Sequence, residues 1–282
     1  MKKLILLLFI PLVFACDIVK KLEDKKNDLD DLNLNGKVKL LKETSYSVVE
    51  KFGEPIKDEF ESHTEYFFNE DGNQIESNRY NEDGELEEKW KIKYDDDGNR
   101  IEVSNYDKDG ELYWKNKLKY DDDGNQIEES SYDKDGELTA KWNYKYDDDG
   151  NRIEGNWYNK DGELTAKLNY KCDDNGNIIE LSGYDKDGEL TGKLKFKYDD
   201  DGNQIESSSY DKDGELEEKW KIKYDKFGNM IYESSYDKNG ELDYKTEFEY
   251  DEFDEEKNWG KRISYQDGKA TKIIEREIEY YD

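Results

Sequence analysis

A unit of 26 residues, which reads YDDDGNQIEESSYDKDGELTAKWNYK over 120–145, repeats along most of this chain. Each unit contains two turn signals, one ending in Gly-Asn and one ending in Gly-Glu-Leu. The first signal begins at Phe68, Tyr94, Tyr120, Tyr146, Cys172, Tyr198, Tyr224 and Tyr250, and the second at Tyr80, Tyr106, Tyr132, Tyr158, Tyr184, Tyr210 and Tyr236. This fixed spacing predicts an array of equivalent units, each in contact with its neighbours.

Each unit predicts two strands. In the longer segment, 85–94, Leu86, Trp90 and Ile92 fall on one face, while glutamate and lysine fall on the other. A period of two is typical of a strand with one buried face. The Asp-x-Asp-Gly segments match hairpin turns that end in a glycine of positive φ. We therefore predict an all-β, elongated antiparallel meander of about sixteen to eighteen strands, solenoid-like and twisted or coiled as a single sheet.

The shorter strand leaves one question open. Ile101 follows Gly98 by three residues, whereas Leu112 follows Gly110 by two. Ile101 and Tyr106 would then face opposite sides of a regular strand. Either the two turns differ in length, or the short strand carries a bulge, or both faces of the sheet are partly covered.

Composition limits the classes of function. The formal net charge is -30, which argues against nucleic acids and anionic lipid surfaces as partners and is compatible with a basic partner or divalent cations. Charged residues make up 42% of the chain, but 14% of residues are aromatic and regularly spaced, which argues against disorder. The two cysteines form no CxxC pair, so neither a disulfide framework nor a thiolate metal site is predicted.

The N-terminus predicts export and lipidation. Lys2 and Lys3 precede the apolar run LILLLFIPLVF, which is too short for a membrane-spanning helix. The following Ala15-Cys16 resembles a bacterial lipobox. That resemblance implies cleavage before Cys16, acylation of this cysteine and attachment to the cell envelope. We favour the outer membrane or the cell surface over the inner membrane, although Asp17 leaves the leaflet open.

We divide the chain into five parts. They are the signal peptide (1–15), a lipid-anchored polar tether (16–35) that could contain one short helix, an N-terminal capping hairpin (36–67), seven repeats (68–249), and a divergent C-terminal repeat with its cap (250–282).

The aromatic residues of the long strands have two interpretations. Tryptophan is replaced by Asn116 in one strand and by Thr246 in another, and there the residue two earlier becomes Trp114 or Tyr244. Such compensation of volume favours a packed core over a ligand platform. Trp157 stands apart, on a short strand where other units carry small or polar residues. The candidate binding residues are Trp157, Trp114, Tyr244 and Trp259.

The acidic turns invite a calcium interpretation. The segment from Asp107 to Leu112 resembles the first half of an EF-hand loop, but the bidentate glutamate six residues after the glycine is missing. Turn capping is the favoured role, and weak calcium binding is the alternative. The candidate ligands are Asp107, Asp109, Asp133 and Asp135; we expect no tight metal site and no cofactor.

The spacing Tyr-Asp-x-x-Gly-Asn-x-Ile over 94–101 resembles the YD repeat of Rhs-type proteins, and Tyr-x-x-Asp-Gly-x-Leu is similar to bacterial MORN-like repeats. The first resemblance implies long antiparallel β-ribbons that coil, sometimes around a toxin, and the second implies an open sheet used for protein contacts. The sequence shows no toxin region after its repeats, so we do not expect it to enclose a cargo.

We expect a non-enzymatic envelope lipoprotein, a scaffold that binds a protein or glycan partner. A polyanionic spacer that binds divalent cations is the first alternative. A glycan-active enzyme is disfavoured, because no pair of carboxylates is singled out by its context. An outer-membrane barrel is disfavoured too, because the face opposite the aromatics carries lysine and glutamate.

Overall fold

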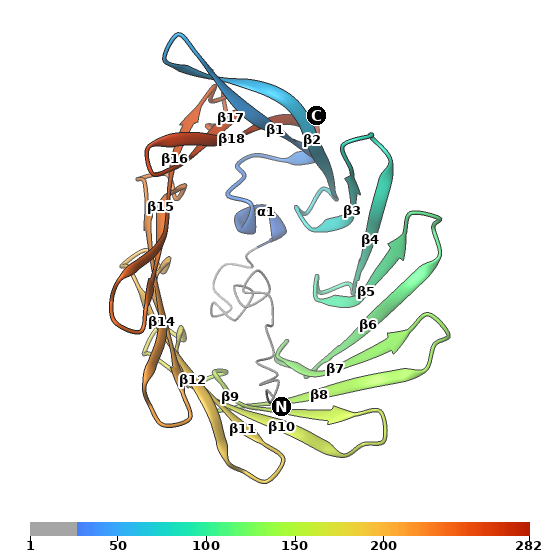
Figure 1. The fold of residues 1–282 in the computed structure, drawn as a ribbon. Helices are drawn as coiled ribbons and strands as arrows, with labels where there is room; N and C mark the ends of the chain where they lie inside the picture. The colour runs from blue at the N-terminus through green and yellow to red at the C-terminus, as the bar shows by residue number, and fades with distance from the viewer. Residues whose placement is uncertain (1–26) are drawn as a thin grey trace.

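The computed structural model describes residues 27–282, which form one short helix and eighteen strands (Figure 1). The helix is α1 (Asp28–Asp31). The strands are β1 (Val38–Lys51), β2 (Glu54–Phe68), β3 (Gln74–Tyr80), β4 (Leu86–Tyr94), β5 (Arg100–Asp107), β6 (Leu112–Tyr120), β7 (Gln126–Asp133), β8 (Leu138–Tyr146), β9 (Arg152–Asn159), β10 (Leu164–Cys172), β11 (Ile178–Asp185), β12 (Leu190–Tyr198), β13 (Gln204–Asp211), β14 (Leu216–Tyr224), β15 (Met230–Asp237), β16 (Leu242–Asp251), β17 (Lys261–Gln266) and β18 (Lys269–Tyr280).

The sheet closes into a barrel. Every strand pairs antiparallel with the next one along the chain, and β1 pairs with both β2 and β18. At this closing contact Val38 lies opposite Tyr280 and Leu41 opposite Ile278. The all-β prediction is confirmed, but the predicted open, solenoid-like or coiled single sheet is wrong. The predicted N-terminal hairpin corresponds to β1 and β2, and β1 also pairs with β18, the last strand.

The physical reason for this error lies in how the apolar face is covered. We rejected a barrel because its charged face could not meet lipid, but a barrel in water needs no apolar exterior. Closing the sheet covers the aromatic face and removes both open edges at once.

The turns explain why the units form hairpins. In the turn after β5, the Asp107 side chain accepts hydrogen bonds from the backbone N–H groups of Asp109 (3.0 Å) and Glu111 (2.9 Å). Gly110 in the same turn has a φ of 79°, a conformation that residues with a Cβ rarely adopt. The same geometry recurs at the other turns of this type, so every unit reverses direction in the same way.

A bulge settles the orientation of the short strand. Between β4 and β5, Lys93 pairs with Glu102 and Tyr94 with Arg100, so Ile101 is the extra residue. Ile101 is 36% exposed and lies on the outer face. Tyr106 shares that face, because the Lys91 Nζ lies 5.7 Å from the centre of its ring. Of the three alternatives, the bulge is the one that the structure contains.

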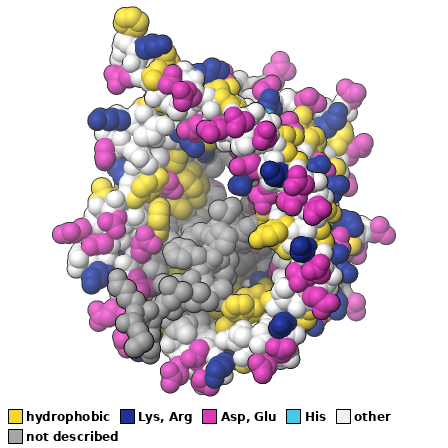
Figure 2. Space-filling view, turned by 45° about the vertical axis from the view of Figure 1, so that its right-hand side comes forward, with side chains coloured by type: hydrophobic (Ala, Val, Ile, Leu, Met, Phe, Trp, Pro, Cys, Tyr) yellow, Lys and Arg dark blue, Asp and Glu magenta, His cyan; other side chains and the backbone are white. Residues whose placement is uncertain are grey.

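The two faces of the barrel differ in chemistry. The outer face carries ladders in which one glutamate binds two lysines; Glu128, for example, lies 2.9 Å from the Lys119 Nζ and 2.6 Å from the Lys141 Nζ. Figure 2 shows charged side chains over the outside and hydrophobic side chains around the mouth of the hollow. The face of the sheet that carries Tyr94 points into the barrel, because the Tyr94 hydroxyl contacts Asp28 of α1, and α1 lies inside the ring of strands (Figure 1).

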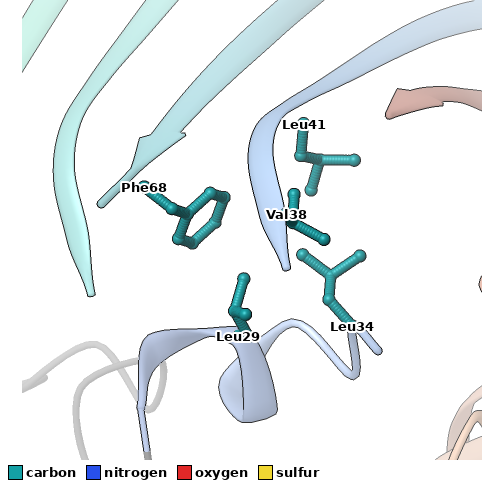
Figure 3. Packing of buried hydrophobic residues seen from close by; sticks show 5 residues of the cluster. All are labelled: Leu29, Leu34, Val38, Leu41 and Phe68. Carbon is teal, nitrogen blue, oxygen red and sulfur yellow. The ribbon is translucent and has the colours of Figure 1, made fainter. Parts of the chain in front are cut away.

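A hydrophobic core lies where the barrel closes. Leu29, Leu34, Val38, Leu41 and Phe68 are all less than 7% exposed and pack together (Figure 3). We call β1, β2, β17, β18, the β16–β17 connection and residues 27–35 the seam. The seam thus holds the N-terminal segment, the two ends of the sheet and this apolar cluster in one place.

The predicted signal peptide and Cys16 lie outside the described residues. Of the predicted tether, 27–35 are described and contain α1. Within 27–282, no helix is both long enough and apolar enough to cross a bilayer.

Candidate functional site: the barrel lumen

The lumen is lined by the aromatic face of the long strands. A barrel of 18 strands is wide enough to leave a channel that its own side chains do not fill. Trp90 and Trp114 illustrate the result. Their ring centres are 5.1 Å apart at 83°, on either side of Asn105, yet both side chains keep intermediate exposure. The rings therefore pack against one another as a core would, but they also face the open lumen.

Trp157 belongs to this lining. It lies directly opposite Trp142 across β8 and β9, and the two rings stack with centres 5.5 Å apart and 7° between their planes. Tyr144 lies nearly parallel to Trp142 at 6.3 Å. The Nε1 of Trp157 is buried and has no hydrogen-bond partner among the described residues.

The other two aromatic candidates, Tyr244 and Trp259, differ in their surroundings. Tyr244 packs beside Trp220, with ring centres 5.9 Å apart, and its hydroxyl donates to Glu233 at 3.2 Å. Trp259 is 4% exposed and lies under the Arg276 guanidinium, whose Cζ is 3.7 Å from the ring centre. Trp259 is thus a packing residue of the seam, whereas Trp114, Trp157 and Tyr244 line the lumen.

A second group of lumenal residues escaped the sequence analysis. Arg152 is only 8% exposed, and its Nη2 and Nε donate to the Tyr146 hydroxyl at 2.9 and 3.2 Å. Its Cζ lies 4.0 Å from the centre of the Tyr144 ring and 5.9 Å from that of Tyr170. Gly155 makes room for these rings, because a Cβ at this position would lie 3.2 Å from the Tyr170 hydroxyl.

Glu129 completes this cluster on β7. Its carboxylate accepts hydrogen bonds from the Asn116 Nδ2 at 2.6 Å and the Gln126 Nε2 at 3.3 Å. Burial raises the pKa of the Glu129 carboxyl above its usual value. Glu129, Arg152 and the rings around them thus offer hydrogen bonds, charge and apolar surface in one part of the wall.

A ring of tyrosines marks the rim formed by the Gly-Asn turns. The first tyrosine of a unit donates its hydroxyl to the backbone carbonyl twenty residues earlier, as Tyr120 does to Arg100 at 2.8 Å and Tyr198 to Ile178 at 2.8 Å. Cys172 replaces tyrosine in one unit, and its Sγ lies 3.9 Å from the Arg152 carbonyl. Burial raises the pKa of this thiol, which does not favour a nucleophilic thiolate.

A segment of the chain is bound inside this rim. The Asn27 Nδ2 donates to the Asp71 carbonyl at 3.1 Å on one side. On the other side, the Asn33 Nδ2 donates to the Asn229 Oδ1 at 2.7 Å, and the Asn35 N–H to the Asn258 Oδ1 at 2.8 Å. Residues 27–35 therefore reach across the lumen, from the turn before β3 to the turns before β15 and β17.

The acidic candidates serve their own turns. The Asp107 and Asp133 side chains each accept hydrogen bonds from two backbone N–H groups. One of the two donors is the N–H of Asp109 or of Asp135, respectively. In the part of the chain that the structure describes, no cluster of three or more acidic, histidine or cysteine side chains could hold a metal ion.

Comparisons with known proteins show no family for this chain. No protein-family model and no curated protein matches this chain. A porin-like protein from Bacteroides uniformis is similar over 87% of this chain and 98% of its own, with 10% identity and a TM-score of 0.42. A porin-like protein from Bacteroides vulgatus matches 86% of this chain and 99% of its own, with 11% identity and a TM-score of 0.35.

A Photorhabdus luminescens Tc holotoxin pore structure matches over 74% of this chain but only 12% of the toxin chain, with 14% identity and a TM-score of 0.35. All three TM-scores are below 0.5, so these likenesses carry no functional conclusion for this chain.

Proposed function

We propose that this protein is a non-enzymatic, lipid-anchored protein of the bacterial cell envelope whose barrel lumen binds a polypeptide segment of a partner protein. The observation that supports this function most directly is that the lumen already holds a polypeptide. Residues 27–35 are bound there by carboxylate, amide and leucine contacts.

The lining supports the same function. Partly exposed rings such as Trp114 and Trp142 offer apolar surface, while Glu129 and Arg152 provide hydrogen-bonding groups between them. Such a mixture suits an extended peptide, which presents side chains and backbone groups together.

The exterior supports a position outside the bilayer. Its glutamate–lysine ladders differ from the apolar band that a transmembrane barrel presents to lipid. Lipidation of Cys16 would supply the attachment. Ten residues lie between Cys16 and Asn27, a reach of at most about 40 Å, so the anchor would hold the barrel close to the membrane.

The test uses the purified mature protein and a labelled nonapeptide, NDLDDLNLN, that copies residues 27–35. We expect saturable binding that Trp142→Ala weakens at least tenfold. The matched control is Tyr113→Ala, an aromatic side chain that is 66% exposed. Equal loss in both variants would contradict a lumenal site. Binding of neutral oligosaccharides such as cellohexaose, without binding of the peptide, would replace the peptide with a glycan.

A further inference from the structure

The Asp28 carboxylate is bound in the lumen by three residues of the repeats, Gln74, Tyr94 and Arg100. The Asp28 Oδ2 lies 2.6 Å from the Tyr94 hydroxyl and accepts the Gln74 backbone N–H at 2.6 Å. Its Oδ1 accepts from the Arg100 Nη2 at 2.8 Å. Guanidinium, phenol and backbone amide thus converge on one carboxylate, and charge-assisted hydrogen bonds of this kind are the strong ones.

The same three residue types recur two units further along the chain. Two units are 52 residues, and adding 52 to Gln74, Tyr94 and Arg100 gives Gln126, Tyr146 and Arg152. The local geometry is the same, because the Tyr146 hydroxyl lies 2.8 Å from the Gln126 carbonyl oxygen and the Tyr94 hydroxyl lies 2.7 Å from the Gln74 carbonyl oxygen. Bulges place Arg100 opposite Tyr94 and Arg152 opposite Tyr146. Both guanidiniums therefore point into the lumen.

The two copies differ in what they bind. Arg100 forms an ion pair with Asp28, but Arg152 forms no ion pair with any residue in 27–282. Its contacts there include the Tyr146 hydroxyl and the faces of aromatic rings, and it acts electrostatically on Tyr170 and Glu129 nearby. No carboxylate of the described residues bonds to this buried guanidinium, because the nearby Glu129 carboxylate is bound by Asn116 and Gln126, so Arg152 favours an incoming anion that contacts it directly.

This arginine is also singular among the equivalent positions. Apart from Arg100, the other units have Gln74, Gln126, Ile178, Gln204 and Met230 there, none of which carries a charge. Arg152 is therefore the second charged residue at this position of the repeat, beside Arg100. Trp142, Trp157 and Tyr144 lie beside it and supply apolar surface for the residues that flank the acidic one.

We propose that Arg152, with Tyr146 and Gln126, is a second carboxylate receptor that binds an aspartate or glutamate side chain of the partner peptide. This inference rests on the proposed function and adds the chemistry that the peptide must carry. The partner segment has one acidic side chain next to an apolar or aromatic one. A polyanionic segment is not favoured, because Glu129 lies close by and the net charge of the chain is -30.

The experiment compares NDLNNLNLN, which keeps one aspartate beside a leucine, with NNLNNLNLN, in which asparagine replaces that aspartate. Binding is measured to the mature protein at 150 mM salt, where the overall charge is screened beyond about 8 Å. We expect the acidic peptide to bind at least tenfold more tightly. Arg152→Gln, which installs the residue found at 126 and 204, should remove this preference. Arg152→Lys should keep part of it, because it retains the charge but not the fork of N–H groups.

Arg79→Gln is the matched control. Arg79 already has carboxylate partners, Glu87 at 3.3 Å and Glu88 at 3.4 Å, so the preference should survive its loss. Equal binding of the two peptides to the unmodified protein would overturn the second receptor but leave lumenal peptide binding intact. So would a preference that persists in Arg152→Gln. Failure of both peptides to bind would overturn the proposed function itself.

Discussion

The repeats β3–β16 and the seam are held together by different forces. Among residues 27–282, seven of the nine buried hydrophobic residues lie in the seam, and the repeats contribute the other two, Tyr170 and Ile178. Buried side chains in the repeats are mainly serines and asparagines, such as Ser104 and Asn105. The repeats are stabilised by capped turns, backbone pairing and outer ion pairs, while the seam has a packed apolar core. The regular units and the apolar core that stabilises the fold therefore lie in different parts of the barrel.

The largest effect should come from the apolar core of the seam. Leu41 is fully buried, so Leu41→Ala should lower the free energy of unfolding by about 2–5 kcal/mol. The matched change in the repeats is Leu164→Ala, where the side chain is 36% exposed and a loss of about 1 kcal/mol or less is expected. Urea denaturation followed by circular dichroism measures both. Similar losses would show that the seam is not the more stable apolar region.

An intermediate effect should come from the link between the two regions. Asp28→Asn removes the ion pair with Arg100 and weakens the contact with Tyr94, and should cost about 1.5–3 kcal/mol. Asp30 is two residues away and exposed, so Asp30→Asn should change stability by no more than about 0.5 kcal/mol. The same denaturation experiment applies. If the two variants matched, segment 27–35 would contribute nothing through its carboxylate.

The smallest effect should come from the outer ladders, and it should depend on pH. Hydrogen bonds from Lys145, Lys167 and Asn156 lower the pKa of Glu154 to about 2. A carboxyl with a lowered pKa stabilises the folded state above its unfolded pKa of about 4.3, and this contribution disappears as the pH falls toward 2.

Glu154→Gln should therefore lower stability at pH 7 by about 1 kcal/mol at most, since Lys145 is 64% exposed. The difference between variant and parent should vanish near pH 2. Glu137→Gln, an exposed carboxylate in a turn, is the control for a general loss of charge. A difference that stayed constant from pH 7 to pH 2 would rule out the ion pairs as its source.

Much of the repeat could be predicted because its information is local. The alternation of Leu86, Trp90 and Ile92 and the Asp-x-Asp-Gly turns are visible within one unit. Closure is not local. It depends on the pairing of β1 with β18, whose sequences do not follow the repeat, and on the curvature that eighteen strands accumulate.

The site shows the same division. Trp157 was singled out as the residue in which one unit differs from the others, and it lines the lumen. Arg152 was missed because an arginine in a polar strand is ordinarily taken to be exposed to solvent. The bulge at Ile153 turns it inward, and only the equal spacing of Tyr94 to Arg100 and Tyr146 to Arg152 could have indicated the shared role.

The pairing of β1 with β18 also has a consequence for folding. Hairpins between successive strands form from neighbouring segments, whereas Val38 must find Tyr280. Contacts between such distant residues are slow to form, because the loop-closure entropy must be overcome first. Until they form, the sheet has two unpaired edges that can join those of another molecule. The late step of assembly, and the point at which aggregation competes with it, is therefore the meeting of the first and last strands.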